Sequence, residues 1–256
     1  MKTLRFFRIP LIGLCIFICS SGAHGQTAMI VGGNVIKTNL SSLAISHYQL
    51  QYERVTGPFT SFAVGFGISP NVSLPFASSV KDNFDDEDVK NTIESISFTK
   101  FTFTPEYRFY AGKKGAPGGF YLATFARYTH MSTKNIYPFT TDDGIPHELE
   151  VEGTFNGYGA GAMIGMQWLL GKSITIDWWI VGPFIGVMNS KFTGVDNHPF
   201  DKLSQQQETD LQQDINDIDL PLWTVDATVK DMNADIKLKG PFYGVRFMGV
   251  SAGFRF

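Results

Sequence analysis

The stretch GVSAGFRF, residues 249–256, indicates a β-strand with two different faces, because its side chains alternate strictly in character. Every second residue is apolar: Val250, Ala252, Phe254 and Phe256. The positions between them hold glycine, serine and Arg255, so an extended chain has one apolar face and one small or polar face. Strand ends fray unless they are held, and a closed barrel pairs both edges of every strand. We therefore expect the closing strand of a β-barrel, with its apolar face as the signal for the outer-membrane assembly machinery.

Seven further segments show the same alternation over about ten residues each. They span residues 35–45, 47–55, 61–68, 100–110, 119–130, 155–170 and 173–184. Short connections such as TGP and GK alternate with long polar ones at about residues 69–99, 131–152 and 188–243, although the first two strands meet directly at AIS. Outer-membrane barrels combine an even number of strands with short periplasmic turns and long external loops. We expect an all-β, eight-stranded antiparallel transmembrane β-barrel over residues 26–256, with a periplasmic C-terminus.

The first 25 residues have the composition of a secretory signal peptide. Lys2, Arg5 and Arg8 precede the short apolar run IPLIGLCIFIC, and small residues follow it. This pattern predicts cleavage between Gly25 and Gln26. Removal of the leader takes away both cysteines and three basic residues, which leaves 18 basic against 24 acidic residues, a net charge of −6. An exported chain without cysteine uses no disulfide, and a dispersed acidic charge argues against a nucleic-acid partner.

Several stretches resemble an uncharacterised family of outer-membrane β-barrels that is widespread in Bacteroidota. The resemblance rests on VIKTNL, FYLATFARY, IDWWIVGP, GFRF and the long segment LSQQQETDLQQDINDIDLPL, and it extends from Val35 to Phe256. That family has no assigned activity. The resemblance therefore implies a fold and a location in the cell outer membrane, and it implies nothing about chemistry.

Charged residues occupy the faces that the alternation assigns to the barrel interior. The expected inward-facing charges are Lys37, Glu53, Lys100, Glu106, Arg108, Arg127, Asp177 and Arg255. An eight-stranded barrel is just wide enough for side chains to fill it, and a buried charge needs a partner or water. We therefore expect a network of ion pairs and hydrogen bonds that plugs the interior. The alternative is a narrow path for ions or small solutes, lined by the same charges.

A lipid-modifying barrel enzyme is a third and less favoured function. It needs a nucleophile beside a histidine base, and only His47 and His130 lie near expected strand ends, where a solvated rim position is the simpler interpretation. HELE, residues 147–150, lacks the second histidine of a zinc-protease helix. The acidic stretches at residues 82–90 and 214–219 lack the glycine and the spaced glutamate of a calcium loop. We expect no enzyme activity, cofactor or metal, and a structural or interaction role for the external loops, whose partner the sequence does not identify.

The longest connection contains an expected helix, DKLSQQQETDLQQDINDIDL, residues 201–220. The apolar residues Leu203, Leu211, Ile215 and Ile218 share one helical face, and six acidic residues surround it. Pro221 would stop the helix. We expect this helix to lay its apolar stripe across the barrel mouth or across the base of its own loop.

Overall fold

The computed structural model describes residues 33–73, 97–113, 115–140, 146–196, 205–218, 222–230 and 233–256. Residues 32–256 form one compact unit, distinct from residues 1–31. The expected signal peptide, with its cleavage site between Gly25 and Gln26, lies outside the described residues. Residues 74–96 of the loop expected at 69–99, and with them the whole acidic stretch at residues 82–90, also lie outside the described residues.

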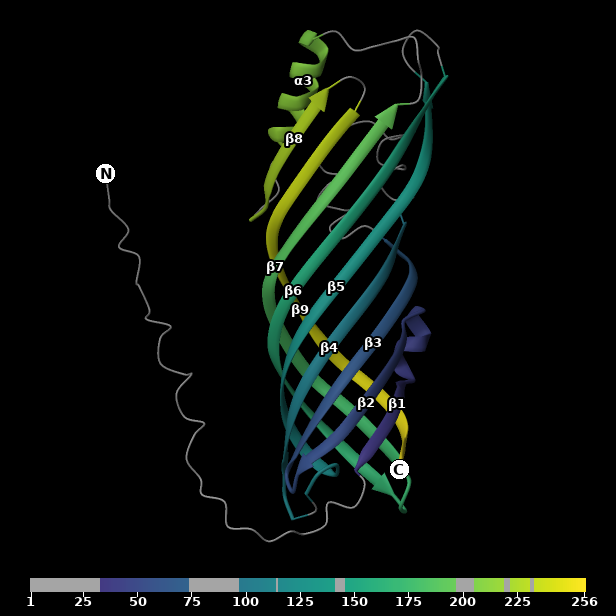
Figure 1. The fold of residues 1–256 in the computed structure, drawn as a ribbon, viewed down its shortest axis with the longest axis vertical. Coiled ribbons are helices and arrows are strands. Elements are labelled where there is room, and N and C mark those ends of the chain that lie inside the picture. The colour runs from purple at the N-terminus through teal and green to yellow at the C-terminus, as the bar shows by residue number, and fades with distance from the viewer. Residues whose placement is uncertain are drawn as a thin grey trace, which may run out of the picture. The chain divides into compact units, whose positions relative to one another are not determined.

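Nine antiparallel strands make up almost all of the described chain (Figure 1). They are β1 (Asn34–Asn39), β2 (Tyr48–Gly57), β3 (Thr60–Ser73), β4 (Ser97–Ala111), β5 (Gly119–Thr140), β6 (Pro146–Leu170), β7 (Ile174–Asp196), β8 (Thr224–Lys230) and β9 (Asn233–Arg255). Each strand from β1 to β6 pairs with the next, β7 pairs with β9, and β9 pairs with β1. These pairings close a ring of eight strands and confirm the predicted all-β barrel. The ninth strand, β8, pairs with β9 only.

The closing contact joins the first and the last strand of the ring. Five residue pairs connect β1 to β9, from Val35 opposite Arg255 to Asn39 opposite Ser251. The backbone of Asn34 also exchanges two hydrogen bonds with that of Phe256, at 2.9 and 3.2 Å. Phe256, Phe254 and Val250 are exposed on the outward face, as the alternation predicts, and Ala252 is half-buried.

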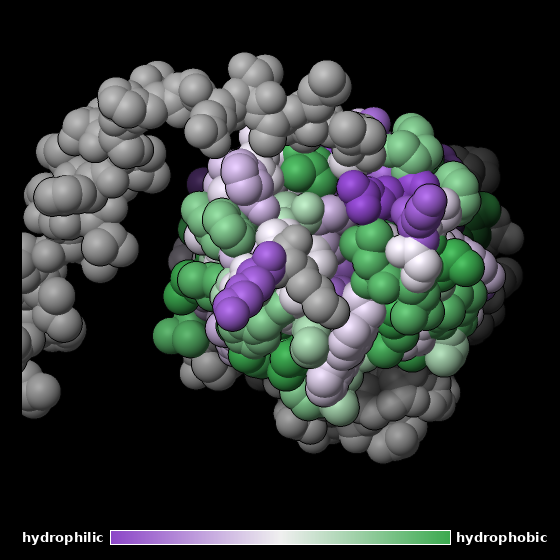
Figure 2. All heavy atoms as spheres, turned by 90° about the horizontal axis from the view of Figure 1, so that it is seen from below, coloured by the Kyte–Doolittle hydropathy of each residue, from purple (hydrophilic) through white to green (hydrophobic). Residues whose placement is uncertain are grey.

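The outward faces of the ring strands carry large apolar side chains. Every strand of the ring contributes at least one exposed member: Ile36, Leu50, Phe66, Phe109, Leu122, Tyr158, Ile185 and Phe247. Along most strands the residues next to them are buried. Exposure therefore alternates with a period of two, as expected for a strand between two different environments. Figure 2, which views the end with the short turns, shows apolar residues along both flanks.

The structure corrects the boundaries expected for the first strand and for the long loops. β1 ends at Asn39, and a 3-10 helix, η1 (Ser41–Ile45), replaces the rest of the expected strand at 35–45. The Asn39 side-chain oxygen accepts hydrogen bonds from the Ser42 backbone N–H and the Ser41 hydroxyl, at 3.0 and 2.8 Å. Such local bonds compete with a strand ladder. The segments expected as loops at residues 131–152 and 188–243 consist largely of strand, because β5, β6, β7 and β9 extend well beyond ten residues.

The predicted helix is present as α3 (Gln205–Asn216), beside β8 at the upper end in Figure 1. Its contact with β8 uses amide side chains one turn apart. Gln212 accepts a hydrogen bond from the Val229 backbone N–H at 3.1 Å, and Asn216 accepts one from the Ala227 N–H at 2.8 Å. The expected apolar stripe of the helix is only partly buried, since Leu211 is exposed. The helix thus covers an edge strand that would otherwise present open N–H groups.

No helix among the described residues is long and apolar enough to cross a membrane.

We predict that replacing Gln212 and Asn216 with alanine frees the edge of β8 while the ring stays assembled. A hydrogen bond of this kind contributes about 0.5–1.5 kcal/mol, so hydrogen exchange at the Ala227 and Val229 amides should accelerate up to about tenfold. Gln206→Ala is the matched control, because the Gln206 side chain donates to Asp210 within the same helix, and no hydrogen bond from it to β8 is present among the described residues. Unchanged exchange in the double variant would show that the two amides do not hold the helix on β8.

Candidate functional site

The barrel interior contains a compact cluster of charged side chains, which we name the charge network. Six buried residues form it, and each is at most 7 % exposed: Lys37, Glu53, Glu106, Arg108, Asp177 and Arg246. They come from β1, β2, β4, β7 and β9. Alternation along each strand turns these side chains inward, and ring closure brings residues that are far apart in sequence into contact.

Lys37 binds two carboxylates, which come from strands on either side of β1 in the ring. Its Nζ lies 2.6 Å from Glu53 Oε2 and 2.7 Å from Asp177 Oδ2. A third donated hydrogen bond reaches Gln167 Oε1 at 2.8 Å. All three donors of the ammonium therefore have partners, which a buried cation requires.

Arg108 is the second hub of the charge network. Its Nη1 lies 2.7 Å from Asp177 Oδ2, and its Nη2 lies 2.6 Å from Glu106 Oε2. Its Nε also donates to Glu106, at 3.0 Å, and its Nη2 donates to Gln51 at 3.1 Å. Glu106 in turn accepts from Arg246 Nη1 at 2.6 Å through its other oxygen. The network holds three cations and three carboxylates, so its formal charges balance.

Neutral side chains complete the network from the remaining strands of the ring. The Tyr110 and Ser61 hydroxyls each donate to Glu53 at 2.5 Å. Tyr121 on β5 donates to Asp177 at 2.8 Å, and Gln167 comes from β6. Every strand of the ring therefore supplies a side chain to one layer that fills the interior.

The structure brings together only part of the set of charges expected from the sequence. Lys37, Glu53, Glu106, Arg108 and Asp177 belong to the charge network. Lys100 and Arg127 face the interior in a separate cavity. Arg255 is half-buried near the short turns, beside Gly112 and Leu170, and takes part in no ion pair within the described residues.

Arg246 belongs to the network although strict alternation from the last strand assigns it to the outward face. The phase of β9 changes at Met248, which has a backbone φ of 46°. Gly249 and Arg246 are both buried, and Phe247 and Met248 between them are exposed. Two outward residues in succession move all following side chains to the other face. β7 changes phase opposite this point, with Trp179 and Gly182 both buried, because its register with β9 is the same before and after Met248. A sequence signal exists, since Tyr243, Val245 and Phe247 alternate as outward apolar residues and leave Arg246 inward.

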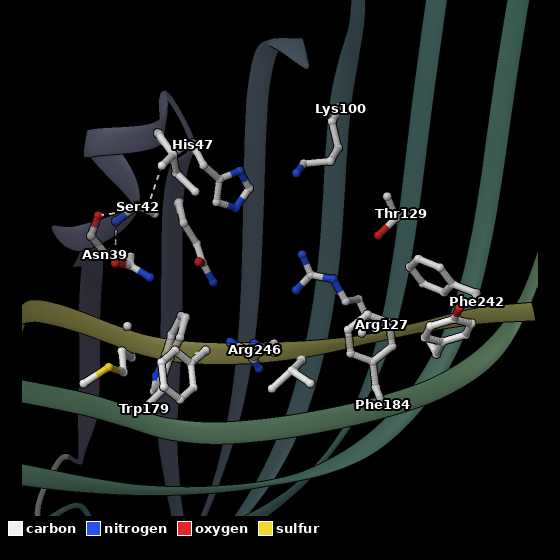
Figure 3. Close-up of a pocket in the computed structure, with 18 of the residues that line it drawn as sticks. Asn39, Ser42, His47, Lys100, Arg127, Thr129, Trp179, Phe184, Phe242 and Arg246 are labelled. Carbon is white, nitrogen blue, oxygen red and sulfur yellow. Dashed lines mark hydrogen bonds between the residues drawn. The ribbon is translucent and has the colours of Figure 1, made fainter. Parts of the chain in front are cut away.

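Beside the charge network lies a cavity of about 620 Å³, which we name the cationic cavity (Figure 3). Its polar lining includes His47, Lys100, Thr129, Arg127 and Arg246. Among the described residues, no carboxylate lies within ion-pair distance of Lys100 or Arg127. Figure 3 shows the side chains of Lys100, Arg127 and Arg246 directed into the same space. The cavity therefore carries excess positive charge.

The histidines occupy positions that differ from the expected solvated rim. His47 is buried, and its Nδ1 lies 2.7 Å from the Ser69 hydroxyl. His130 is half-buried and bonds to Asn156 at 2.9 Å. Ser69 is only 2 % exposed, so the serine beside His47 is not open to a substrate.

Two apolar clusters bound the cationic cavity along the barrel. Trp179 and the adjoining Phe184 belong to a cluster with Tyr110, Tyr121 and Phe125. Met131, Met188 and the adjoining Phe242 belong to a second cluster, with Phe98 and Phe155. Members of both clusters line the cavity. Apolar side chains of the described residues thus make up much of the cavity lining.

Comparison with known families gives one finding. A family model described as "Protein of unknown function (DUF3575)" matches residues 12–213. A search of the curated proteins finds no match.

We predict that Arg108→Met destabilises the barrel strongly, because three carboxylates lose a partner at once. Breaking a buried pair from one side costs about 3–5 kcal/mol. Urea unfolding of the purified protein in detergent, followed by tryptophan fluorescence, measures the change.

The matched comparison is a double-mutant cycle on Lys37 and Glu53. The double variant Lys37→Met/Glu53→Gln should lose less stability than the sum of its single variants, since it removes both charges of one pair. Additive losses, or an Arg108→Met protein as stable as the unmodified one, would contradict the network.

Proposed function

The chain belongs to the family described as protein of unknown function DUF3575, and from that premise we propose that it is an integral β-barrel of the bacterial cell outer membrane. Its interior is plugged, and its role is structural or interactive, carried by the parts that face the outside. We further propose that it is one of the outer-membrane barrels widespread in Bacteroidota.

A ring closed by the pairing of β1 with β9, with an apolar outside and a charge-balanced network across its interior, carries this proposal. A lipid bilayer leaves no water for open backbone groups, so a sheet crosses it only when its edges are joined. Exposed apolar side chains on all eight ring strands favour contact with hydrocarbon over contact with water. A chain that folded in water would gain nothing from exposing so many large apolar residues.

Orientation follows from the unequal ends of the barrel. We place the short turns and the C-terminus on the periplasmic side, where outer-membrane barrels carry short turns. The long upper parts of β5, β6, β7 and β9, together with β8 and α3, then face the outside. These are the parts through which we propose contact with an extracellular partner. Phe256, Phe254, Ala252 and Val250 remain the proposed signal for the assembly machinery.

The plugged interior favours a non-conducting role over a narrow channel. The charge network and the neutral side chains bonded to it come from all eight strands of the ring, and each charge in the network has a partner of opposite sign. We also propose that the protein is not an enzyme, because the serine beside His47 is buried.

We predict that a protease site inserted between Gln213 and Asp214 is cut in intact cells, since α3 faces the outside in this orientation. The barrel should remain heat-modifiable on gels, because the insertion touches no strand. The same site inserted between Lys172 and Ser173, in the turn joining β6 and β7, is the control, and it should be cut only after the outer membrane is opened. The reverse pattern would invert the proposed topology, and recovery of the protein outside the outer-membrane fraction would refute the location.

We predict that the purified protein conducts poorly in planar bilayers, because the charge network occupies the cross-section of the ring. Detergent without protein sets the background current. Large, steady single-channel currents from the unmodified protein would contradict the plug and support the channel alternative.

A further inference from the structure

One edge of β9 has a stretch that pairs with no other described strand. β8 pairs with β9 from Asn233 to Lys239, and β1 pairs with it from Ser251 to Arg255. Between Gly240 and Gly249, β9 keeps its pairing with β7 on the other edge only. The ring of eight strands therefore has a side opening at this level.

The short first strand causes this opening. The chain leaves β1 after Asn39 and turns into η1, and two hydrogen bonds end the contact with β9. The Leu40 N–H donates to the Val250 carbonyl at 2.8 Å, and the Val250 N–H donates to the Ser41 hydroxyl at 3.0 Å. On the other side of η1, β2 begins only at Tyr48. Neither β1 nor β2 extends far enough to cover the edge of β9.

The side opening connects the cationic cavity with the apolar outer surface. The cavity lining includes Tyr243, Val245 and Phe247, whose side chains are 59–67 % exposed on the outer face. It also includes Arg246 from the inward face of the same strand. Ile45 of η1 also lines the cavity and is exposed, so the lining reaches the outer surface beside β9 and η1.

Buried hydrogen-bonding atoms around the cavity lack partners within the described residues. They are Thr129 Oγ1, Trp179 Nε1 and Arg246 Nη2. Unsatisfied buried polar groups are uncommon and costly. The indole and guanidinium groups can only donate, and the hydroxyl can donate as well. Together with the ammonium of Lys100 and the guanidinium of Arg127, these donors match a group that accepts several hydrogen bonds and carries negative charge.

The remaining lining is suited to an apolar chain. Phe184, Phe242, Met131 and Met188 line the cavity, and the guanidinium of Arg246 lies 4.2 Å from the centre of the Trp179 ring. A free inorganic anion would contact the cations but neither these apolar surfaces nor the side opening. An anion attached to an apolar tail would contact the cations and the apolar lining, and its tail would occupy the side opening.

We propose that the cationic cavity binds the oxyanion head, phosphate or carboxylate, of an amphiphile whose apolar tail passes through the side opening beside β9 to the outer surface. The direction of entry rests on the proposed outer-membrane location, because only there does the opening face lipid. Binding of the head rests on the cavity itself.

Tryptophan fluorescence of the purified protein in an uncharged maltoside detergent tests the proposal. The probe is dodecyl phosphate, and the comparison ligands are inorganic phosphate and zwitterionic dodecylphosphocholine. We expect saturable binding of dodecyl phosphate, at least tenfold tighter than either comparison ligand. A Trp179→Phe variant should lose the signal, which assigns it to the cavity.

The second part of the experiment substitutes the two cavity cations, Lys100 and Arg127. Lys100→Met and Arg127→Met should each weaken dodecyl phosphate binding about tenfold or more. Each removes a cation that has no carboxylate partner among the described residues, so thermal stability in the absence of ligand should hold or rise. Lys134→Met, which removes an exposed cation from the outer surface, is the control and should bind normally.

Three outcomes would overturn the proposal. They are no saturable binding to the unmodified protein, binding that both cavity variants leave unchanged, and equal affinity for inorganic phosphate, which would mark a site for a soluble anion. All of these measurements are made in detergent. They can therefore fail while the protein still fractionates with the outer membrane, or succeed while it does not, which separates this inference from the proposed function.

Discussion

The pairing of β1 with β9 is the constraint on which the rest of the structure depends. Five residue pairs and two hydrogen bonds between Asn34 and Phe256 join the two ends of the sheet. The join divides the side chains of every ring strand into an inner and an outer set. Closure creates two environments, so the outer set can be apolar while the inner set is charged.

The same pairing is short, and its length divides the barrel into two regions. Where β1 and β9 are paired, the ring is complete, and three cations meet three carboxylates in a layer with little exposure to solvent. After Asn39 the chain forms η1. The edge of β9 that faces away from β7 therefore has no strand partner until β8 pairs with it. The cationic cavity lies at this level, so the excess charge and the open edge share one cause.

Much of the barrel was predictable because alternation is a local property of the chain. Lys37, Glu53, Arg108 and Asp177 were placed inward correctly, since each lies in a stretch of unbroken period two. Strict alternation does not place Arg246 inward, because the backbone at Met248 has a positive φ and the phase of β9 changes there. The first strand was predicted too long because the Asn39 side chain bonds to the local backbone and ends it. Helix α3 was predicted from its pattern, but its contact with β8 depends on Gln212 and Asn216.

By itself, the sequence determined the class of fold, the number of strands in the ring and the face on which most charges lie. These follow from the order of polar and apolar residues along an extended chain, which needs no knowledge of neighbouring strands. The tertiary structure decided which charges meet, because the contact of Lys37 with Asp177 depends on ring closure and register. It also decided that Lys100 and Arg127 lie apart from any carboxylate of the described chain. The side opening arises from the unequal lengths of β1, β8 and β9, a relation between strands that no single stretch of sequence contains.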